Sequence, residues 1–163
     1  MTSPVTNRMR KKVSVATVEL SFSALPAHVR TARLVAAAVA RRSGVDEAVL
    51  DEVRLAVGEA CSRAVHLHRR HCPERPVQVT LIDDAEAFRV IVTDEAPSSD
   101  AVDSLDGAGA GLDDLARSDD LDMVPPGVGL AVITGLVDDV SVEPADRPDG
   151  NGLVVRMSWP TPA

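Results

Sequence analysis

The residues best suited to chemistry lie in the stretch from Asp51 to Arg70, DEVRLAVGEACSRAVHLHRR. If this stretch is a helix with about 100° per residue, one face carries an apolar stripe typical of core packing. That stripe consists of Val53, Ala56, Val57, Ala60 and Ala64. Polar side chains, Glu59 and Arg63 among them, gather beside the stripe. A carboxylate at the edge of a buried face can point into a cleft. The simpler interpretation is an i, i+4 ion pair between Glu59 and Arg63 on a solvated flank, worth about 0.2–0.5 kcal/mol.

Two further positions could bind a ligand. Asp94 ends an apolar, alternating run and precedes a long loop, where a carboxylate can accept hydrogen bonds from a ligand or initiate a turn. Gly127-Val128-Gly129 leads directly into a predicted helix, whose first backbone N–H groups form an anion site that glycine leaves open. A Rossmann turn is excluded because Pro125-Pro126, rather than a strand, precedes these glycines.

Other polar clusters are less informative. His66, His68, His71 and Cys72 do not share one helix face at ligand-like spacing, so we expect no metal site there. Cationic side chains near a helix C-terminus are a simpler explanation of these histidines. The Gly107 to Gly111 tract lacks the Lys-Ser/Thr of a P-loop, and we expect a flexible hinge.

Composition narrows the function classes. The chain has 163 residues, a net charge of −8 and 2% aromatic residues. Nucleic-acid binding requires clustered cations or stacking aromatics, so we expect no nucleic-acid partner. No apolar run approaches the roughly 20 residues of a membrane span. The absence of such an apolar run, together with two cysteines that form no disulfide framework, predicts a cytoplasmic protein.

The elements that position these residues are predicted strands and helices, which differ in the spacing of their apolar residues. Residues 13–22, 77–82, 88–93, 139–143 and 153–159 are predicted strands, and DDAEA joins the second and third in a hairpin. A first helix should begin at Leu25-Pro26 and end near Arg42, before Gly44. Asp46 is a candidate N-cap of the helix that carries Glu59, which ends before Pro73. A further helix is predicted over residues 129–137.

The order of these elements predicts an α+β fold: a two-layer α/β sandwich with a mixed, mostly antiparallel sheet and helices on one face. We expect a disordered tail over residues 1–12 and a single domain over residues 13–160. The irregular segment at about residues 95–126 is predicted to be a functional lid, with one short helix near residues 112–117.

The three candidate positions occur in a familiar order. The chain has a predicted helix with Glu59-Ala60 and Arg63-Ala64, then a strand that ends at Asp94, a loop, and a helix that begins at Gly127-Val128-Gly129-Leu130. This order resembles that of the anti-sigma-factor serine/threonine kinases of the RsbW/SpoIIAB type. These are members of the GHKL (Bergerat-fold, histidine kinase-like) ATPase superfamily. The resemblance covers about residues 13–159 and implies ATP as the cofactor.

The resemblance assigns a role to each matching residue. Glu59 matches the catalytic acidic residue, and Asp94 matches the aspartate that hydrogen-bonds the adenine amino group. Gly127 and Gly129 match glycines whose helix N–H groups approach the phosphates. On the first helix, Arg33 matches a basic residue used for partner contact, and Arg30 lies nearby. The implied partners are a sigma factor and/or an anti-anti-sigma (STAS-type) protein, with a homodimer as the expected assembly.

Three departures from the family pattern bear on activity. Arg63 stands where the family has an Mg²⁺-binding Asn, and an arginine has no acceptor atom for a cation. Ala96 and Pro97 follow Asp94 where the family has glycines, and the closing strand begins at Gly152-Leu153 where relatives often carry Thr.

These changes predict a regulatory binding protein with nucleotide binding weakened or lost, a pseudokinase. The alternative is an active serine/threonine protein kinase with Glu59 as base. Arg63 could pair with Glu59, or contact a phosphate directly without magnesium.

Overall fold

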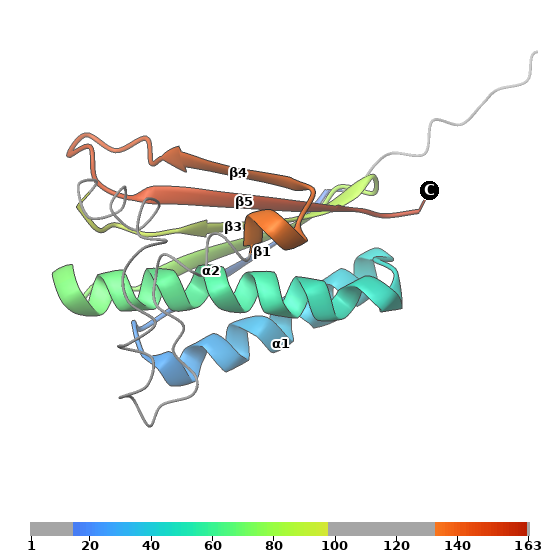
Figure 1. Cartoon of the computed structure of the whole chain (residues 1–163), viewed down its shortest axis with the longest axis horizontal. Helices are drawn as coiled ribbons and strands as arrows, with labels where there is room; N and C mark the ends of the chain where they lie inside the picture. The colour runs from blue at the N-terminus through green and yellow to red at the C-terminus, as the bar shows by residue number, and fades with distance from the viewer. Residues whose placement is uncertain (1–14, 98–132, 163) are drawn as a thin grey trace, which may run out of the picture.

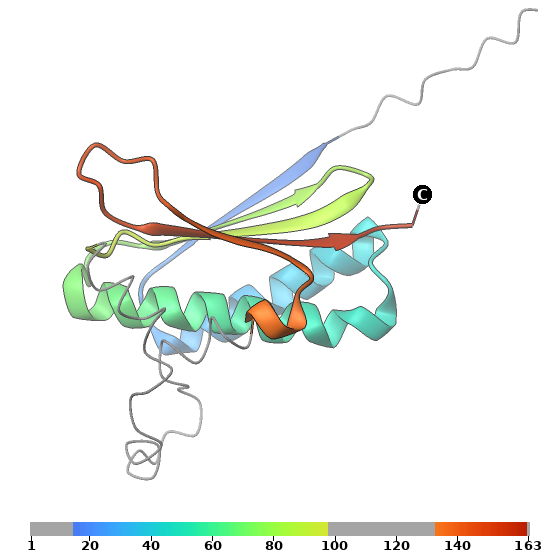
Figure 2. The same cartoon turned by 45° about the horizontal axis from the view of Figure 1, so that its top comes forward.

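Two long helices cover one face of a five-stranded sheet (Figures 1 and 2). The computed structural model describes residues 15–97 and 133–162. The strands are β1 (Ala16–Phe22), β2 (Val77–Asp83), β3 (Ala87–Thr93), β4 (Asp139–Pro144) and β5 (Leu153–Pro160). Their order in the sheet is β1-β2-β3-β5-β4, and every neighbouring pair is antiparallel. The predicted α+β two-layer architecture is confirmed.

Helix α1 (Pro26–Ser43) has the ends that its sequence predicts. Pro26 occupies the first turn, where its missing N–H costs no hydrogen bond. Gly44 closes the helix with φ 92° in the left-handed region, and its N–H donates to the carbonyls of Ala40 and Arg41. Because a side chain at this φ is strained, glycine is the natural residue at this helix end.

Helix α2 (Leu50–His71) begins differently from the prediction. A 3-10 turn (Glu47–Val49) precedes it, and Asp46 caps this turn by accepting a hydrogen bond from the Ala48 N–H at 2.8 Å. Asp46 is therefore a cap of the short turn rather than of α2 itself. At the other end, the Cys72 N–H still donates to the His68 carbonyl, and Pro73 follows.

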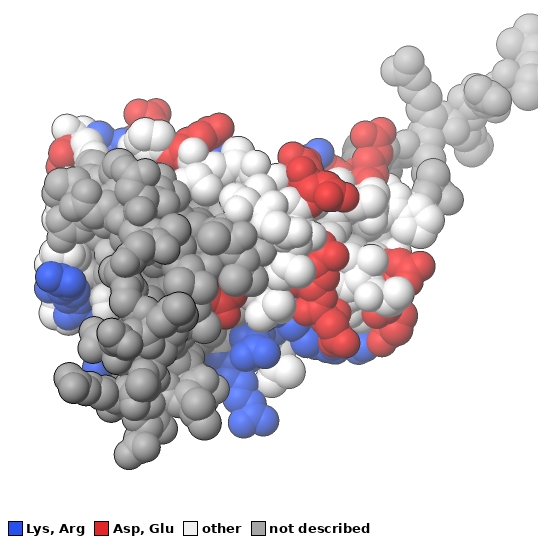
Figure 3. Space-filling model, viewed as in Figure 1, with Lys and Arg blue, Asp and Glu red and all other residues white. Residues whose placement is uncertain are grey.

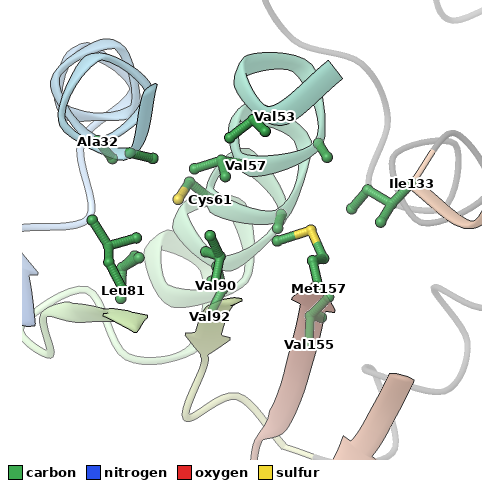
Figure 4. Close-up of a cluster of buried hydrophobic side chains, with 14 of the residues drawn as sticks. Ala32, Val53, Val57, Cys61, Leu81, Val90, Val92, Ile133, Val155 and Met157 are labelled. Atoms are coloured by element: carbon green, nitrogen blue, oxygen red, sulfur yellow. The ribbon is translucent and has the colours of Figure 1, made fainter. Parts of the chain in front are cut away.

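The core lies between the helices and the sheet (Figure 4). The predicted stripe of α2 is buried, and the alanines of α1 at positions 32, 36 and 40 are also buried, which allows the two helices to approach closely. From the sheet come Leu81, Val90, Val155 and Met157, with Ile133 packing beside them. Full burial of one such side chain contributes about 1.5–3 kcal/mol, so this cluster is the main anchor of α2 on the sheet.

The last strand is tied to α2 by a polar contact as well. Trp159 stacks on Phe88 with ring centroids 6.1 Å apart, and its indole N–H donates to Glu52 Oε1 at 2.8 Å. Glu52 thus provides the hydrogen-bond acceptor for a buried indole.

Several predicted features fall outside the described residues. These are the tail at 1–12, most of the loop at 95–126, the short helix at 112–117, and Gly127 and Gly129. Of the predicted helix at 129–137, the described part is helical over residues 133–136. Among the described helices, none has the length and apolar character needed to cross a membrane.

Candidate nucleotide site

A buried ion pair joins α2 to the end of β3. Arg63 Nη1 donates to Asp94 Oδ2 at 2.7 Å, and the two side chains are 2% and 1% exposed. The predicted Glu59–Arg63 pair is not among the ion pairs of the described residues. The Arg63 side chain instead crosses from the helix to the sheet, because the Asp94 carboxylate is buried there and requires a partner.

The other carboxylate oxygen of Asp94 accepts hydrogen bonds from backbone N–H groups after the end of β3 and at the start of β5. Oδ1 accepts hydrogen bonds from the Ala96 N–H at 3.1 Å and the Leu153 N–H at 3.3 Å. The Asp94 N–H in turn donates to the Leu153 carbonyl at 3.0 Å. Asp94 therefore holds the start of β5 against the end of β3, in addition to pairing with Arg63.

Gly152 makes this close approach possible. It adopts φ +93°, and a Cβ at this position would lie 2.2 Å from the Asp94 carbonyl oxygen. Its N–H donates to the Ala96 carbonyl at 2.7 Å. Sequence reasoning missed this role, although the turn-rich segment PADRPDGNG before β5 was a signal of an unusual backbone.

His68 anchors the same loop from α2. It is fully buried, and its Nδ1 lies 2.9 Å from the Arg75 carbonyl oxygen. Its Nε2 lies 2.9 Å from the Glu95 N–H, which can only donate, so Nε2 accepts and the ring proton sits on Nδ1. The interpretation of His68 as a cationic side chain at the helix end is wrong, because both ring nitrogens are used by a neutral ring.

Glu95 completes the connections around the loop. It accepts hydrogen bonds from Arg75 at 2.7 Å and from Arg147 at 2.6 Å. Burial acts to raise the pKa of Glu95, but the hydrogen bonds from the two arginines outweigh it, and the pKa lies below its ordinary value. Residues 94–96, which follow β3, are therefore held by α2, by the segment before β2 and by the β4–β5 loop.

Glu59 lies one helical turn before Arg63 and is only partly buried. Burial raises the pKa of its carboxyl group, and the charge of Arg33 partly offsets this. Arg33 reaches across from α1 over Gly58, where a Cβ would lie 2.9 Å from Arg33 Cδ. The glycine in the middle of α2 thus makes room for the arginine that lies near Glu59.

The structure brings some of the predicted site residues together and not others. Arg63 is paired with Asp94, and Arg33 lies against Gly58 and acts on the charge of Glu59, one helical turn before Arg63. Arg30 is exposed on α1. Cys61 lies in the core, where burial raises the pKa of its thiol to about 12, so it is not a nucleophile.

The donor set does not fit a magnesium ion. Mg²⁺ requires oxygen ligands, and the side chain at the matching position is the Arg63 guanidinium, which has none. Within residues 15–97 and 133–162, no group of three or more His, Cys, Asp or Glu side chains could hold a metal.

Comparison with known proteins gives a consistent result over nearly the whole chain. The model of the histidine kinase-like ATPase domain matches residues 22–159. The serine-protein kinase RsbW of Bacillus subtilis (strain 168) is 28% identical over 142 residues, which are 86% of this chain and 83% of that protein. RsbW of Bacillus velezensis is 28% identical over 146 residues, 89% of this chain and 86% of that protein.

A solved structure shares the fold. One chain of the SiaB–SiaC complex from Pseudomonas aeruginosa superposes with a TM-score of 0.60 at 14% identity, covering 87% of this chain and 89% of that chain. Because the family match over residues 22–159 includes both helices and nearly all of strands β2 to β5, the chain belongs to the histidine kinase-like ATPase domain family.

Proposed function

We propose that this protein is an anti-sigma-type regulator that acts by binding other proteins and has lost magnesium-dependent phosphoryl transfer. The observation that carries the proposal is the buried Arg63–Asp94 ion pair. One partner of this pair stands at the position of the family's magnesium ligand, and the other stands at the position of its adenine acceptor.

The ion pair opposes both the binding of magnesium and the binding of the adenine base. Magnesium bridges and neutralises the phosphates in ordinary phosphoryl transfer, and Arg63 cannot coordinate it. Asp94 accepts three hydrogen bonds from this chain's own groups and is 1% exposed, so an adenine amino group would have to displace the guanidinium. Removing one partner from a buried ion pair costs about 3–5 kcal/mol, which weighs against that exchange.

The partner surface we propose is the outer side of α1. Arg30 is exposed there, and Leu34, one turn later, is 59% exposed. Basic side chains gather at the lower edge of the face shown in Figure 3, where Figure 1 places α1. An apolar side chain beside an arginine is typical of protein interfaces. The RsbW relatives and the SiaB–SiaC complex support an anti-anti-sigma (STAS-type) partner, and a sigma factor and a homodimer are further parts of this proposal.

Calorimetric titration with ATP, with and without Mg²⁺, tests the nucleotide part of the proposal. We expect no submicromolar, magnesium-dependent binding by the wild-type protein. The Arg63→Asn variant should gain magnesium-dependent affinity, because the amide supplies a ligand oxygen and releases Asp94. Thermal unfolding of the variant checks that it is folded. Tight magnesium-dependent binding by the wild type would contradict the proposal.

Co-purification from cells tests the regulatory part. We expect a sigma factor or a STAS-domain protein to be recovered, and the Arg30→Glu variant to recover less of it. Arg156→Glu, on the sheet rather than on α1, is the matched control. If neither kind of protein is recovered, the regulatory proposal fails.

One observation favours the alternative of an active kinase. The raised pKa of Glu59 moves it toward the range that suits a general base near neutral pH. In that case ATP would phosphorylate a serine of the STAS-type partner, and the Glu59→Gln variant would abolish the phosphate transfer. The titration above distinguishes the two functions, because the kinase requires bound Mg²⁺ and ATP.

A further inference from the structure

A fully buried histidine joins the end of α2 to two segments that are distant in the chain. The His68 side chain is 0% exposed, and both of its ring nitrogens are hydrogen-bonded. Nδ1 donates to the Arg75 carbonyl oxygen, before β2, and Nε2 accepts from the Glu95 N–H, after β3, each at 2.9 Å. We call these two hydrogen bonds the His68 bridge.

The His68 bridge requires a neutral ring. A neutral imidazole has one donor and one acceptor, whereas an imidazolium has two donors and no acceptor. After protonation, Nδ1 could still donate to the Arg75 carbonyl. At Nε2, however, a ring N–H would face the Glu95 N–H, and two donors cannot share a hydrogen bond. Protonation therefore breaks the contact with Glu95 and spares the contact with Arg75.

The charged groups around the bridge do not favour a charged ring. Asp94 pairs with Arg63, and Glu95 pairs with Arg75 and with Arg147 of the β4–β5 loop. Both carboxylates that follow β3 are thus already matched by arginines, so an imidazolium would add a buried positive charge without a counterion of its own. The other titratable or charged side chains nearby belong to the end of α2 and the turn after it: Arg69, His71, Cys72 and Glu74.

We propose that His68 is a pH-sensitive switch, which holds residues 94–96 on α2 while its ring is neutral and releases Glu95 from α2 when its ring is protonated. Asp94, which stands at the family's adenine position, is the residue next to the released N–H. The switch therefore links pH to the backbone of the candidate nucleotide site. It acts whether or not a nucleotide is bound, so the inference does not depend on the proposed function.

The direction of the pH effect follows from the unfolded chain. An unperturbed histidine titrates near pH 6.5, at about the acid end of the physiological range. Below this pH the released or unfolded chain takes up a proton that the intact bridge excludes, so the bridge weakens as the pH decreases. Glu59 acts on stability in the opposite direction, because burial raises its pKa. A measurement at the bridge itself is therefore needed to separate the two effects.

Hydrogen exchange of the Glu95 amide, measured by NMR on the full chain from about pH 8 to about pH 5, provides this measurement. Protection is expressed relative to the intrinsic exchange rate at each pH. We expect the protection of Glu95 to fall about tenfold per pH unit below about pH 6.5, as one proton is taken up on opening. The Ala145 amide, which donates to the Gly152 carbonyl, is the internal control and should not follow this fall.

His68→Gln is the informative variant, because its carboxamide has a donor and an acceptor but does not titrate. Whatever its protection at pH 7, Glu95 in this variant should show no fall on acidification. His28→Gln is the matched control. His28 Nδ1 also contacts a carbonyl oxygen, that of Ser23 at 3.0 Å, but the ring is partly exposed and accepts no backbone N–H in the described structure. This variant should keep the pH response of the wild type.

The ring nitrogens of the wild type give a second measurement, which decides the matter if His68→Gln does not fold. Their ¹⁵N shifts should show a proton on Nδ1 and none on Nε2 at neutral pH, and Nε2 should become protonated together with the loss of Glu95 protection. Constant protection of Glu95 across the pH range, a proton on Nε2 at neutral pH, or an unchanged pH response in His68→Gln would each overturn the inference. None of these results would alter the ATP titration that tests the proposed function.

Discussion

At the scale of single residues, the role of Arg63 depends on which carboxylate it pairs with. Helical spacing places Glu59 one turn away, and an exposed i, i+4 pair would be worth only a few tenths of a kcal/mol. The partner in the structure is Asp94, 31 positions later in the chain and buried with it. A buried pair of this kind makes each partner indispensable to the other, since either one alone would be an uncompensated buried charge.

Glu59 gives a prediction for the pH dependence of stability. Its pKa is raised in the folded protein, mainly by burial, so the folded state binds this proton more tightly than the unfolded chain does. The stability that Glu59 contributes is present below its ordinary pKa and is lost as the pH rises through the raised pKa. Glu59→Gln should therefore gain stability relative to the wild type at neutral pH, and the gain should vanish toward about pH 4. Urea unfolding over this pH range measures it.

The Arg33→Gln background provides the control for this prediction. Arg33 lowers the pKa of Glu59, so its removal should raise that pKa further and make the stability gained by Glu59→Gln at neutral pH larger. A gain that is independent of pH would show that packing at position 59, rather than the proton of Glu59, is responsible.

At the scale of elements, the junction of α2, β3 and β5 decides the shape of the site. Asp94 and Gly152 bring the ends of β3 and β5 into contact, and His68 attaches the following loop to α2. These contacts use backbone groups, so residues 94–96 after β3 are held by hydrogen bonds rather than by apolar packing alone.

Gly152→Ala tests how closely this junction is packed. The added Cβ would meet the Asp94 carbonyl oxygen at 2.2 Å, and the backbone would have to move. Gly150→Ala is a matched control, because Gly150 also has a positive φ, +70°, but nothing lies within 4 Å of its Cβ direction. We expect Gly150→Ala to cost about 1–2 kcal/mol, the strain of a left-handed alanine, and Gly152→Ala to cost at least about 2 kcal/mol more.

Denaturant unfolding of the two variants provides the comparison. Equal losses of stability would mean that the approach of Gly152 to Asp94 is looser than the structure shows.

At the scale of the whole molecule, one core connects both helices to all parts of the described sheet. Trp159 is the only tryptophan of the chain and sits within that core, bonded to Glu52 of α2. If residues 13–160 form a single domain, as the sequence predicts, Trp159 fluorescence and helical circular dichroism should follow the same unfolding curve in urea. A helical transition that is separated from the fluorescence change would show that the chain unfolds in more than one unit.

Most of the fold could be predicted from local patterns. The strands alternate with period two and the helices with period 3.6, Pro26 and Gly44 mark the ends of α1, and the order of elements requires the helices to cover one face of the sheet. The start of α2 was less predictable, because Asp46 caps a 3-10 turn as readily as an α-helix.

The sequence by itself determined the family, through the order of Glu59, Asp94 and Gly127-Val128-Gly129, and it identified Arg63 as the main departure from that family. Only the tertiary structure decided what Arg63 does. Spacing along a helix reports neighbours within a turn, whereas the contact with Asp94 depends on how α2 lies across the ends of β3 and β5. The long arginine side chain can reach either carboxylate. It pairs with Asp94 because Asp94 is buried, and leaving its charge unpaired would cost more than leaving the partly exposed Glu59 unpaired.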